Sequence, residues 1–377
     1  MNQALEVAKS GQTAVVFMDN DFSIDLITTD SFSKEKPFYQ IWDFSKPEVI
    51  ENFALTLTDG QVIANSIPTI ELASKIERLY QLYLLILENL GEYSLDGASK
   101  SILSAACKVV FTKPNQTFYD LYQFIADYDV RKKHLKALEL KDHPLLTDYE
   151  LGLLQALNKR ERVSKPFERG TASIKIEKVE TGETDLSVAG SLLRRFNLIF
   201  RDFRIKTLLS NKPTIDYNLS QLFKPGKLTI FYFPRLKYTP EIRDCLTLLL
   251  TLNLQLIQES QSTPLNPVHV IYDEIFQTPC SLKLLTRSLN DFSQLNLCPT
   301  ITLLTSEHGS KFLDNVLPYR PEYTLLSKPD YATLYHLKLS HLRYSIEELN
   351  WGRFNSLHLT PQSTEKDVVL KEISALH

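Results

Sequence analysis

The sequence predicts an α/β protein in which a parallel β-sheet is combined with an inserted block of helices. The unbroken apolar run Ala14–Met18 and the largely apolar run Leu228–Phe233 are typical of strands buried on both faces of a sheet. After residue 228 such runs alternate with helical stretches, which favours right-handed crossovers and a parallel sheet. Between residues 66 and 165, apolar residues instead recur every three or four positions, as they do in helices.

The first 65 residues contain one predicted helix and two predicted strands. Residues 2–9 are expected to form a short helix that Gly11 closes. The run Ala14–Met18 is a predicted strand that ends at Asp19, and Phe38–Phe44 is the second strand. We interpret residues 1–65 as the first part of the α/β core.

Residues 66–165 are interpreted as an all-α insertion into this core. One helical face is carried by Leu72, Ile76, Leu79, Tyr83, Ile86 and Leu90. Further helices are predicted near residues 101–110, 118–126 and 148–157. Residues 159–165 and Gly170 are expected to mark the end of the insertion.

Residues 166–377 are the predicted second part of the core. The expected strands are 173–179, 228–233, 268–272 and 300–305. The expected helices are 186–209, 241–258 and 282–294, the first of them a single long helix. Each of the last three strands is thus separated from the next by a helix, as in a parallel sheet.

The composition excludes several classes of protein. A net charge of −3 over 377 residues does not describe a polycation, so nucleic-acid binding would need a local basic patch. The cysteines at 107, 245, 280 and 298 form no CxxC pair, which favours a reducing compartment over a disulfide framework. The apolar runs fall short of the roughly 20 residues that a membrane span needs.

No metal site is predicted. The eight histidines form no HExxH motif, and we interpret His336 and His341 as part of a strand or helix surface. Asp19, Asp21 and Asp25 lack the glycine and the distal glutamate of a calcium-binding EF-hand loop, so they are interpreted as turn residues.

An acidic pair, Asp273-Glu274, follows the predicted strand 268–272. Open α/β sheets bind ligands at the carboxyl ends of their strands. In nucleotide hydrolases such a pair holds a magnesium-bound water and activates the attacking water. The alternative is a helix cap followed by an acidic first turn.

Three other segments accompany this pair in a particular order. Residues 220–234 lead into an apolar strand and end in proline, residues 302–308 read TLLTSEH, and residues 2–19 combine a helix with a strand ending in aspartate. In order and spacing, these segments resemble the type IV secretion coupling proteins, the DNA-translocating ATPases of conjugation. The resemblance covers most of the chain and implies a RecA-like fold, a parallel sheet of the P-loop NTPase type, with an inserted all-α domain.

The resemblance also implies roles for individual residues. Asp273 would be the magnesium ligand and Glu274 the general base of an ATPase. Glu307 stands where the family has a glutamine that senses the γ-phosphate, a departure that affects sensing. Arg287 and Arg320 lie where a ring ATPase presents an arginine finger.

A phosphate-binding loop is absent from the 377 residues. Such a loop needs GxxxxGK[ST], because its glycines let backbone amides close around phosphate. The single Gly-Lys pair, Gly226-Lys227, is followed by leucine. The resemblance starts with the helix that follows the family's loop, so we expect the sheet either to close around a missing strand or to receive one from elsewhere.

A basic, aromatic-rich helix is a candidate nucleic-acid surface. It carries Arg194, Arg195, Arg201 and Arg204, interleaved with phenylalanines. These arginines would contact a phosphate backbone or an acidic protein surface. The alternative is a solvated helix face whose aromatic residues enter the core.

Three functions follow from these patterns. The first is a non-hydrolysing relative of a DNA-translocating coupling ATPase, a pseudo-ATPase that acts as a docking or adaptor component in DNA transfer or mobile-element DNA handling. The second is an active ATPase subunit whose phosphate loop another chain supplies. The third is an unrelated α/β protein-interaction module.

Cofactors and partners follow from the first two functions. On its own the chain is expected to bind no cofactor, and ATP and magnesium would be bound only with a phosphate loop supplied in trans. Expected partners are proteins of a DNA-transfer complex, DNA, a chain that bears the phosphate loop, or further copies of this chain. The expected location is cytoplasmic, including the periphery of the inner membrane.

Overall fold

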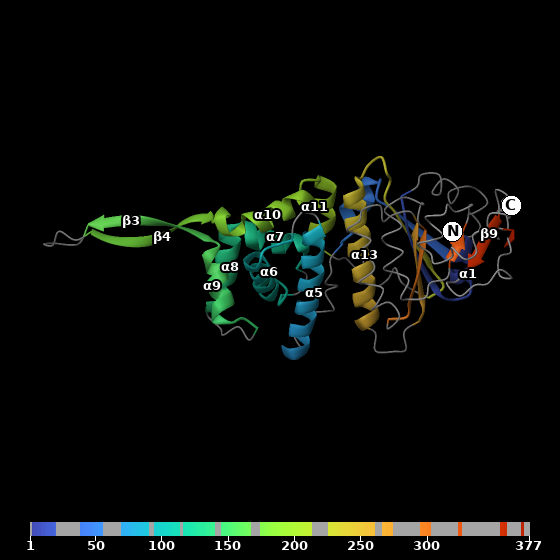
Figure 1. Ribbon diagram of the computed structural model, residues 1–377, viewed down its shortest axis with the longest axis horizontal. Coiled ribbons are helices and arrows are strands. Elements are labelled where there is room, and N and C mark those ends of the chain that lie inside the picture. Colours follow the sequence, from blue (N-terminus) through green and yellow to red (C-terminus); the bar gives the residue numbers. More distant parts are fainter. Residues whose placement is uncertain are drawn as a thin grey trace, which may run out of the picture. The chain divides into compact units, whose positions relative to one another are not determined.

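The computed structural model describes the chain in thirteen stretches: residues 2–19, 38–55, 69–89, 94–113, 116–139, 145–166, 174–212, 225–260, 266–273, 295–302, 323–325, 355–359 and 371–372. The chain divides into two compact units, which are coloured along the sequence in Figure 1. The sheet unit comprises residues 1–43, 225–248 and 265–377, and the helical unit comprises residues 44–224 and 249–264.

Five parallel strands form the main sheet of the sheet unit, in the order β2-β5-β1-β6-β7. They are β1 (Thr13–Met18), β2 (Tyr39–Asp43), β5 (Leu228–Tyr232), β6 (Val268–Asp273) and β7 (Leu297–Thr302). Strand β1 is central, with β5 on one side and β6 on the other. The predicted parallel sheet is confirmed, and the described strands follow one another without a break.

Helix α1 (Asn2–Lys9) covers one face of the central strands. Its residues Ala4, Leu5 and Ala8 are buried against alternate residues of β1 and β5. Gly11 ends the helical segment with a φ of 87°, a left-handed conformation that suits glycine. The alanines at positions 4 and 8 are small, which allows α1 to lie close to the sheet.

Two further elements complete the described part of the sheet unit. Strands β8 (Tyr323–Leu325), β9 (Asn355–Leu359) and β10 (Lys371–Glu372) form a small antiparallel sheet. Helix α13 (Pro240–Ser260) leads from β5 towards β6, and its residues up to Leu248 belong to the sheet unit.

The larger part of the helical unit, residues 44–224, lies between β2 and β5 in the sequence. Its helices are α4 (Pro47–Asn52), α5 (Thr69–Asn89), α6 (Gly97–Val110), α7 (Phe118–Ala126), α8 (Tyr128–Glu139), α9 (Asp148–Ala156), α10 (Leu186–Phe200) and α11 (Phe203–Ser210). Side-chain caps start several of them: Thr117 and Thr147 form capping boxes with Asp120 and Glu150.

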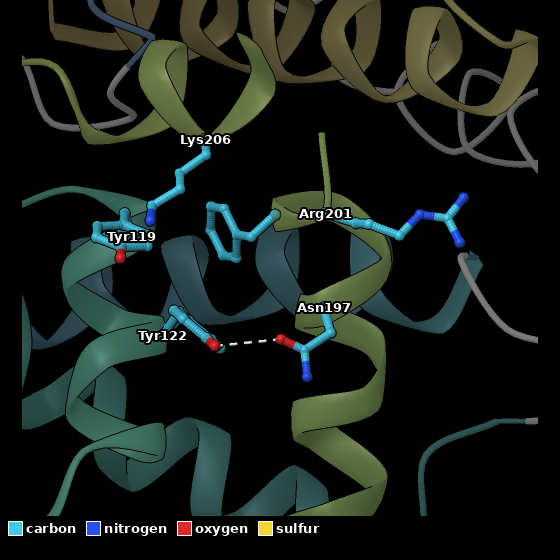
Figure 2. Close-up of a pocket in the computed structure, with 6 residues that line it drawn as sticks. Tyr119, Tyr122, Asn197, Arg201 and Lys206 are labelled. Atoms are coloured by element: carbon cyan, nitrogen blue, oxygen red, sulfur yellow. Dashed lines mark hydrogen bonds between the residues drawn. The ribbon is translucent and has the colours of Figure 1, made fainter. Parts of the chain in front are cut away.

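An aromatic cluster holds the helical unit together. Phe118 is stacked on Tyr83, with ring centroids 4.3 Å apart, and it also contacts Phe196 and Phe200. Tyr122 continues the cluster, with its ring 5.0 Å from that of Phe200 (Figure 2). Rings at these separations add to the stability that their buried area provides.

A long two-stranded hairpin also belongs to the helical unit. Strand β3 (Asn158–Pro166) pairs antiparallel with β4 (Ile174–Thr184). The hairpin starts beside Arg131 of α8, which is fully buried. The Arg131 guanidinium donates hydrogen bonds to Asn158 Oδ1, to Thr184 Oγ1 and to the carbonyl oxygens of Phe124, Ile125 and Leu157.

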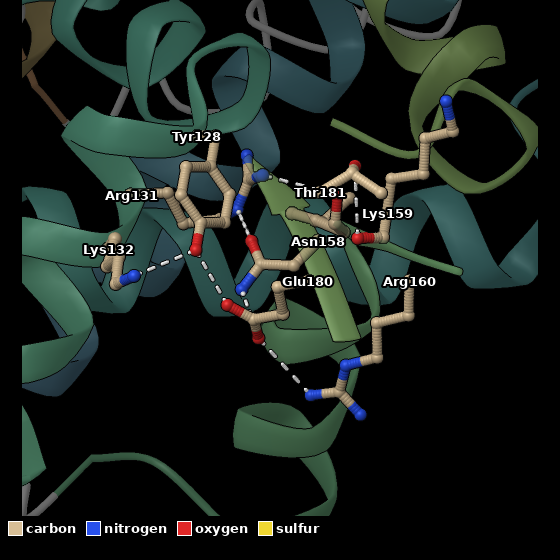
Figure 3. Close-up of polar contacts among 9 residues, drawn as sticks. Tyr128, Arg131, Lys132, Asn158, Lys159, Arg160, Glu180 and Thr181 are labelled. Atoms are coloured by element: carbon tan, nitrogen blue, oxygen red, sulfur yellow. Dashed lines mark hydrogen bonds and ion pairs between the residues drawn. The ribbon is translucent and has the colours of Figure 1, made fainter. Parts of the chain in front are cut away.

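A second set of polar contacts fixes the base of the hairpin (Figure 3). The Tyr128 hydroxyl donates to Glu180 Oε2 at 2.7 Å, and Lys132 donates to the Tyr128 oxygen at 2.9 Å. Asn158 and Arg160 donate to Glu180 Oε1. The base is therefore tied to α8 through side chains from both strands.

The structure differs from the sequence prediction in the extent of the insertion. The helical unit comprises residues 44–224 and 249–264, whereas the predicted insertion spans 66–165, and it contains the β3–β4 hairpin besides its helices. The predicted long helix 186–209 is two helices, because the side chain of Asp202 caps the amino end of α11. The predicted helix 282–294 lies outside the described residues.

Within the described ranges, no helix is both long and apolar enough to cross a membrane.

Replacing Arg131 with methionine is expected to lower the free energy of unfolding by about 3 kcal/mol, because several buried acceptors lose their donor. Urea unfolding of the full chain, followed by circular dichroism, measures this loss. Arg162→Met, an exposed change on the same hairpin, is the control and is expected to have little effect. Equal losses for the two variants would contradict the anchoring role.

The Glu180 network predicts a dependence of stability on pH. The hydrogen bond from Tyr128 lowers the pKa of Glu180, and Asn158 and Arg160 act in the same direction. The stabilisation is therefore complete above the unfolded-state pKa of about 4.3 and is lost as the pH falls through the lower folded-state value.

Glu180→Gln is expected to flatten the fall in stability between about pH 5 and pH 3. Urea midpoints of the wild type and the variant across this range measure the difference. The exposed change Glu161→Gln on strand β3 is the control. Parallel curves for wild type and Glu180→Gln would count against the network.

Candidate functional site at the carboxyl edge of the sheet

The carboxyl ends of the five parallel strands are aligned across the sheet. The register pairs Met18 of β1 with Tyr232 of β5 and with Asp273 of β6. It also pairs Asp43 of β2 with Tyr232, and Asp273 with Thr302 of β7. This row is the edge at which open α/β sheets bind ligands.

Three stacked rings support this edge. Phe17 of β1 lies between Phe231 of β5 and Tyr272 of β6, with ring centroids 5.3 Å apart in both pairs. The rings are nearly parallel, at 15° and 12°. All three are buried, one residue before the ends of their strands, so they hold the three central strands in register.

Asp19 is the charged residue at the centre of the edge. It follows β1 directly, and its side chain is fully buried. Arg235 approaches Oδ1, with Nε at 2.9 Å and Nη2 at 2.8 Å. Arg243 approaches Oδ2, with Nη1 at 3.0 Å. Each carboxylate oxygen therefore faces its own guanidinium.

The two arginines come from the segment between β5 and the first turns of α13. The backbone N–H of Phe233 donates to the carbonyl of Met18 at 2.9 Å, which extends the pairing of β5 and β1 by one residue. Pro234 then begins a turn that contains Arg235, which is partly exposed. Arg243 lies in α13 and is almost fully buried. We call Asp19, Arg235 and Arg243 the edge cluster.

Comparison with known proteins was made on the whole chain. No family model matches it, and no curated protein matches its sequence. Among solved structures, VirB4 of Thermoanaerobacter pseudethanolicus is similar, with a TM-score of 0.53 and 12% sequence identity over 97% of this chain and 83% of VirB4. The chain shares the fold of VirB4.

A second solved structure is the bacterial conjugative coupling protein TrwBΔN70, with a TM-score of 0.43 and 13% identity over 98% of this chain and 87% of that one. The RecA-like fold class that the sequence predicted, and the resemblance to type IV secretion and conjugation proteins, are confirmed at the level of the fold. VirB4 and this chain are only 12% identical, so roles of individual side chains cannot be transferred from VirB4. The role of each side chain is inferred from its own contacts in this structure.

Of the predicted catalytic residues, the structure describes Asp273. It is the last residue of β6, half-buried, in register with Met18 and therefore beside the strand that leads to Asp19. Glu274, Glu307, Arg287 and Arg320 lie outside the described residues. Among the described residues, no group of three histidine, cysteine, aspartate or glutamate side chains could hold a metal ion.

The single Gly-Lys pair of the sequence lies at the opposite edge of the sheet. Gly226 has a φ of 73° and donates its N–H to the carbonyl of Gln12. The carbonyl of Lys227 accepts from Ala14, at the amino end of β1. A Cβ at position 226 would lie 3.8 Å from the carbonyl oxygen of Ala8. This pair therefore makes a tight turn against α1 and β1 and is not a phosphate loop.

The four arginines of the predicted nucleic-acid surface have different environments. Arg194 and Arg201 are exposed. Arg195 is buried and donates to the carbonyl oxygens of Leu87 and Glu88, so its guanidinium is used inside the helical unit and not on a surface. Arg204 is bound to Asp202, with Nη2 at 2.6 Å from Oδ2.

The sequence indicates that Asp19 ends a buried strand, but it does not indicate which side chains bind Asp19. An aspartate after an apolar strand is visible in the sequence, whereas Arg235 lies 216 positions further along the chain. Asp19 was interpreted as a turn residue, and in the structure it is the buried acid of an ion cluster. Nothing local in the sequence indicates which arginine a buried acid will meet.

Asp19→Asn is expected to lower the free energy of unfolding by about 3–5 kcal/mol, because the buried Arg243 would lose its counter-charge. Chemical unfolding of the full chain measures the loss. Glu241→Gln removes an exposed acid from the first turn of α13 and is expected to cost under about 0.5 kcal/mol. A similar small cost for Asp19→Asn would show that the edge cluster does not stabilise the sheet.

Proposed function

We propose that this chain is a docking or adaptor component of a DNA-transfer machine, a relative of its ATPases that does not hydrolyse ATP by itself. The support is the fold that it shares with VirB4 and the arrangement at the carboxyl edge of its sheet. Its partners are the protein components of that machine, including chains that carry a complete ATPase site.

The edge cluster is the observation that carries this proposal. A site for magnesium and nucleotide phosphates needs free carboxylates for the metal and free cations for the phosphates. At this edge, the carboxylate of Asp19 is engaged by the guanidiniums of both Arg235 and Arg243. Breaking a buried pair of this kind to bind a ligand would cost several kcal/mol.

The sequence supports the same proposal. The 377 residues contain no GxxxxGK[ST], the pattern whose backbone amides surround the β- and γ-phosphates in a phosphate-binding loop. The turn at Gly226 is committed to packing against α1 and β1. A chain with this edge can keep the ATPase architecture as a scaffold while other subunits hydrolyse ATP.

A second candidate function rests on the position of Asp273. It ends a strand next to the centre of the sheet and is half-buried. In this alternative, a phosphate loop supplied by another chain would complete an ATPase site, with Asp273 as the magnesium ligand and Glu274 as the general base. The two candidates differ in whether Asp273 is needed for DNA transfer.

The first prediction concerns nucleotide at the edge. The purified chain is expected to show no ATP hydrolysis, and any shift of its melting temperature by 1 mM Mg·ATP is expected to be the same in the Asp273→Ala variant. A site with a Kd of about 0.1 mM would contribute about 1.4 kcal/mol, a shift of roughly 2 °C for a chain of 377 residues. A shift of that size that disappears in Asp273→Ala would refute the non-hydrolysing function.

The second prediction concerns DNA transfer in the cell. Deletion of the gene is expected to reduce the transfer frequency, and the Asp273→Ala variant is expected to restore it. Restoration by the wild type but not by Asp273→Ala, at equal protein levels, would favour the alternative with a completed ATPase site. Unchanged transfer in the deletion strain would remove the proposed role altogether.

A further inference from the structure

The β3–β4 hairpin is an arm of the helical unit that is held firmly at its base. The base is bound to α8 through the buried guanidinium of Arg131 and through the hydrogen bond from Tyr128 to Glu180. Figure 1 shows both strands leading away from α8 and α9. Beyond the base, the side chains of Arg162 and Lys178 are exposed. At these positions the hairpin therefore offers a surface that the described helices do not cover.

Opposite charges face each other at the base of the hairpin. Lys159 Nζ of β3 lies 2.7 Å from Glu183 Oε2 of β4. Arg160 Nη2 of β3 lies 3.5 Å from Glu180 Oε1, and the register of the two strands pairs these residues directly. Opposite charges on neighbouring strands favour the pairing of those strands. The cations at the base are therefore paired within the hairpin itself.

Like charges face each other further out along the hairpin. The register places Arg162 of β3 opposite Lys178 of β4, two residues beyond Arg160 and Glu180 and so on the same face. The Cβ atoms of directly opposite residues are about 4.5–5.5 Å apart, and like charges at this separation destabilise a hairpin. Among the described side chains, no carboxylate forms an ion pair with either Arg162 or Lys178. A carboxylate from outside the hairpin would relieve this repulsion.

The free edge of the hairpin that carries most positive charge is the edge of β3. Within the described residues β3 pairs with β4 alone, so the backbone N–H and C=O groups of its other edge are open to a further strand. Strand β3 contains four basic residues and one acidic residue, whereas β4 contains two basic and three acidic residues. A hairpin of two strands is marginally stable in water and gains stability from a third strand. A strand added to β3 would therefore meet a basic edge.

From these observations we infer that the hairpin binds an extended acidic segment of a partner protein, which pairs with the free edge of β3. The backbone of this segment continues the hairpin as a third strand. One of its carboxylates lies beside Arg162, on the face that Arg162 shares with Lys178. The charge of β3 repels a basic strand and also the β3 strand of a second copy, so this edge selects strands that are acidic.

The hairpin suits an acidic polypeptide better than a nucleic acid. Phosphates along β3 would meet Glu161, which is exposed and lies between Arg160 and Arg162 in the sequence, and they would also meet the acidic residues of β4. The edge of a strand offers backbone donors and acceptors at the spacing of another strand. The inference goes beyond the proposed function, because it concerns the helical unit and holds whether or not the chain takes part in DNA transfer.

The test measures, by fluorescence anisotropy, how the full chain binds a labelled peptide of alternating glutamate and valine with nine residues, the length of β3. Arg162→Glu is expected to weaken binding by about fivefold or more, because an attraction beside β3 becomes a repulsion. Arg194→Glu, an exposed change on α10 with the same change of charge, is the control and is expected to alter binding by less than about twofold. A matched peptide of glutamine and valine is expected to bind the wild type about fivefold more weakly or worse.

Reversing the charge of the hairpin extends the test. The double variant Arg162→Glu with Lys178→Glu is expected to prefer a peptide of lysine and valine over the peptide of glutamate and valine, the opposite of the wild type. In the wild type, bound peptide is expected to slow hydrogen exchange in β3 more than in β4, since the added strand pairs with the edge of β3. Circular dichroism confirms that each variant is folded, and Lys178→Glu alone is a second variant if the double variant is not.

Several results would overturn the inference. One is that the peptide of glutamate and valine does not bind at about 1 mM, and another is that the glutamine peptide binds equally well. Equal weakening by Arg194→Glu and Arg162→Glu, or slowed exchange in a segment other than β3, would place the peptide elsewhere on the chain. A DNA duplex of about 15 base pairs that displaces the peptide, and that binds more weakly to Arg162→Glu, would show that the hairpin binds nucleic acid instead.

Discussion

The carboxylate of Asp19 is removed from water at the end of the central strand, and the geometry of the sheet edge depends on how that charge is balanced. A buried carboxylate without a partner would cost several kcal/mol. Arg235 and Arg243 balance it from the turn after β5 and from α13. The cluster thus joins the end of β1 to the segment that follows β5, 216 positions further along the chain at Arg235.

In the helical unit, Arg131 is a second charged side chain that is buried and therefore needs hydrogen-bond partners. Burial lowers the pKa of this guanidinium to about 10, so it still carries its charge at neutral pH. Five oxygen acceptors from α7, the end of α9 and both hairpin strands surround it. In both units, therefore, a buried charged side chain connects elements that are distant in sequence. Arg201 of the helical unit is exposed instead and lines a surface pocket that contains aromatic side chains.

Much of the fold could be predicted from the sequence because its signals are local. The apolar runs gave the buried strands, and the periodicity of residues 72–90 gave α5. The break between α10 and α11 was missed because no glycine or proline marks it, and its signal is the capping side chain of Asp202. Strand β3 was missed because its charged residues resemble a linker. The edge cluster and the pocket could not be predicted, since each joins residues from segments that meet only in the folded chain.

The most direct test of this account is a double-mutant cycle on Asp19 and Arg243, with the free energy of unfolding measured for Asp19→Asn, Arg243→Met and the double variant. If the two side chains form a buried ion pair at the sheet edge, the double variant should be more stable than the sum of the single losses predicts, by at least about 2 kcal/mol. Additive losses would contradict the account, because the two charges would then not depend on each other.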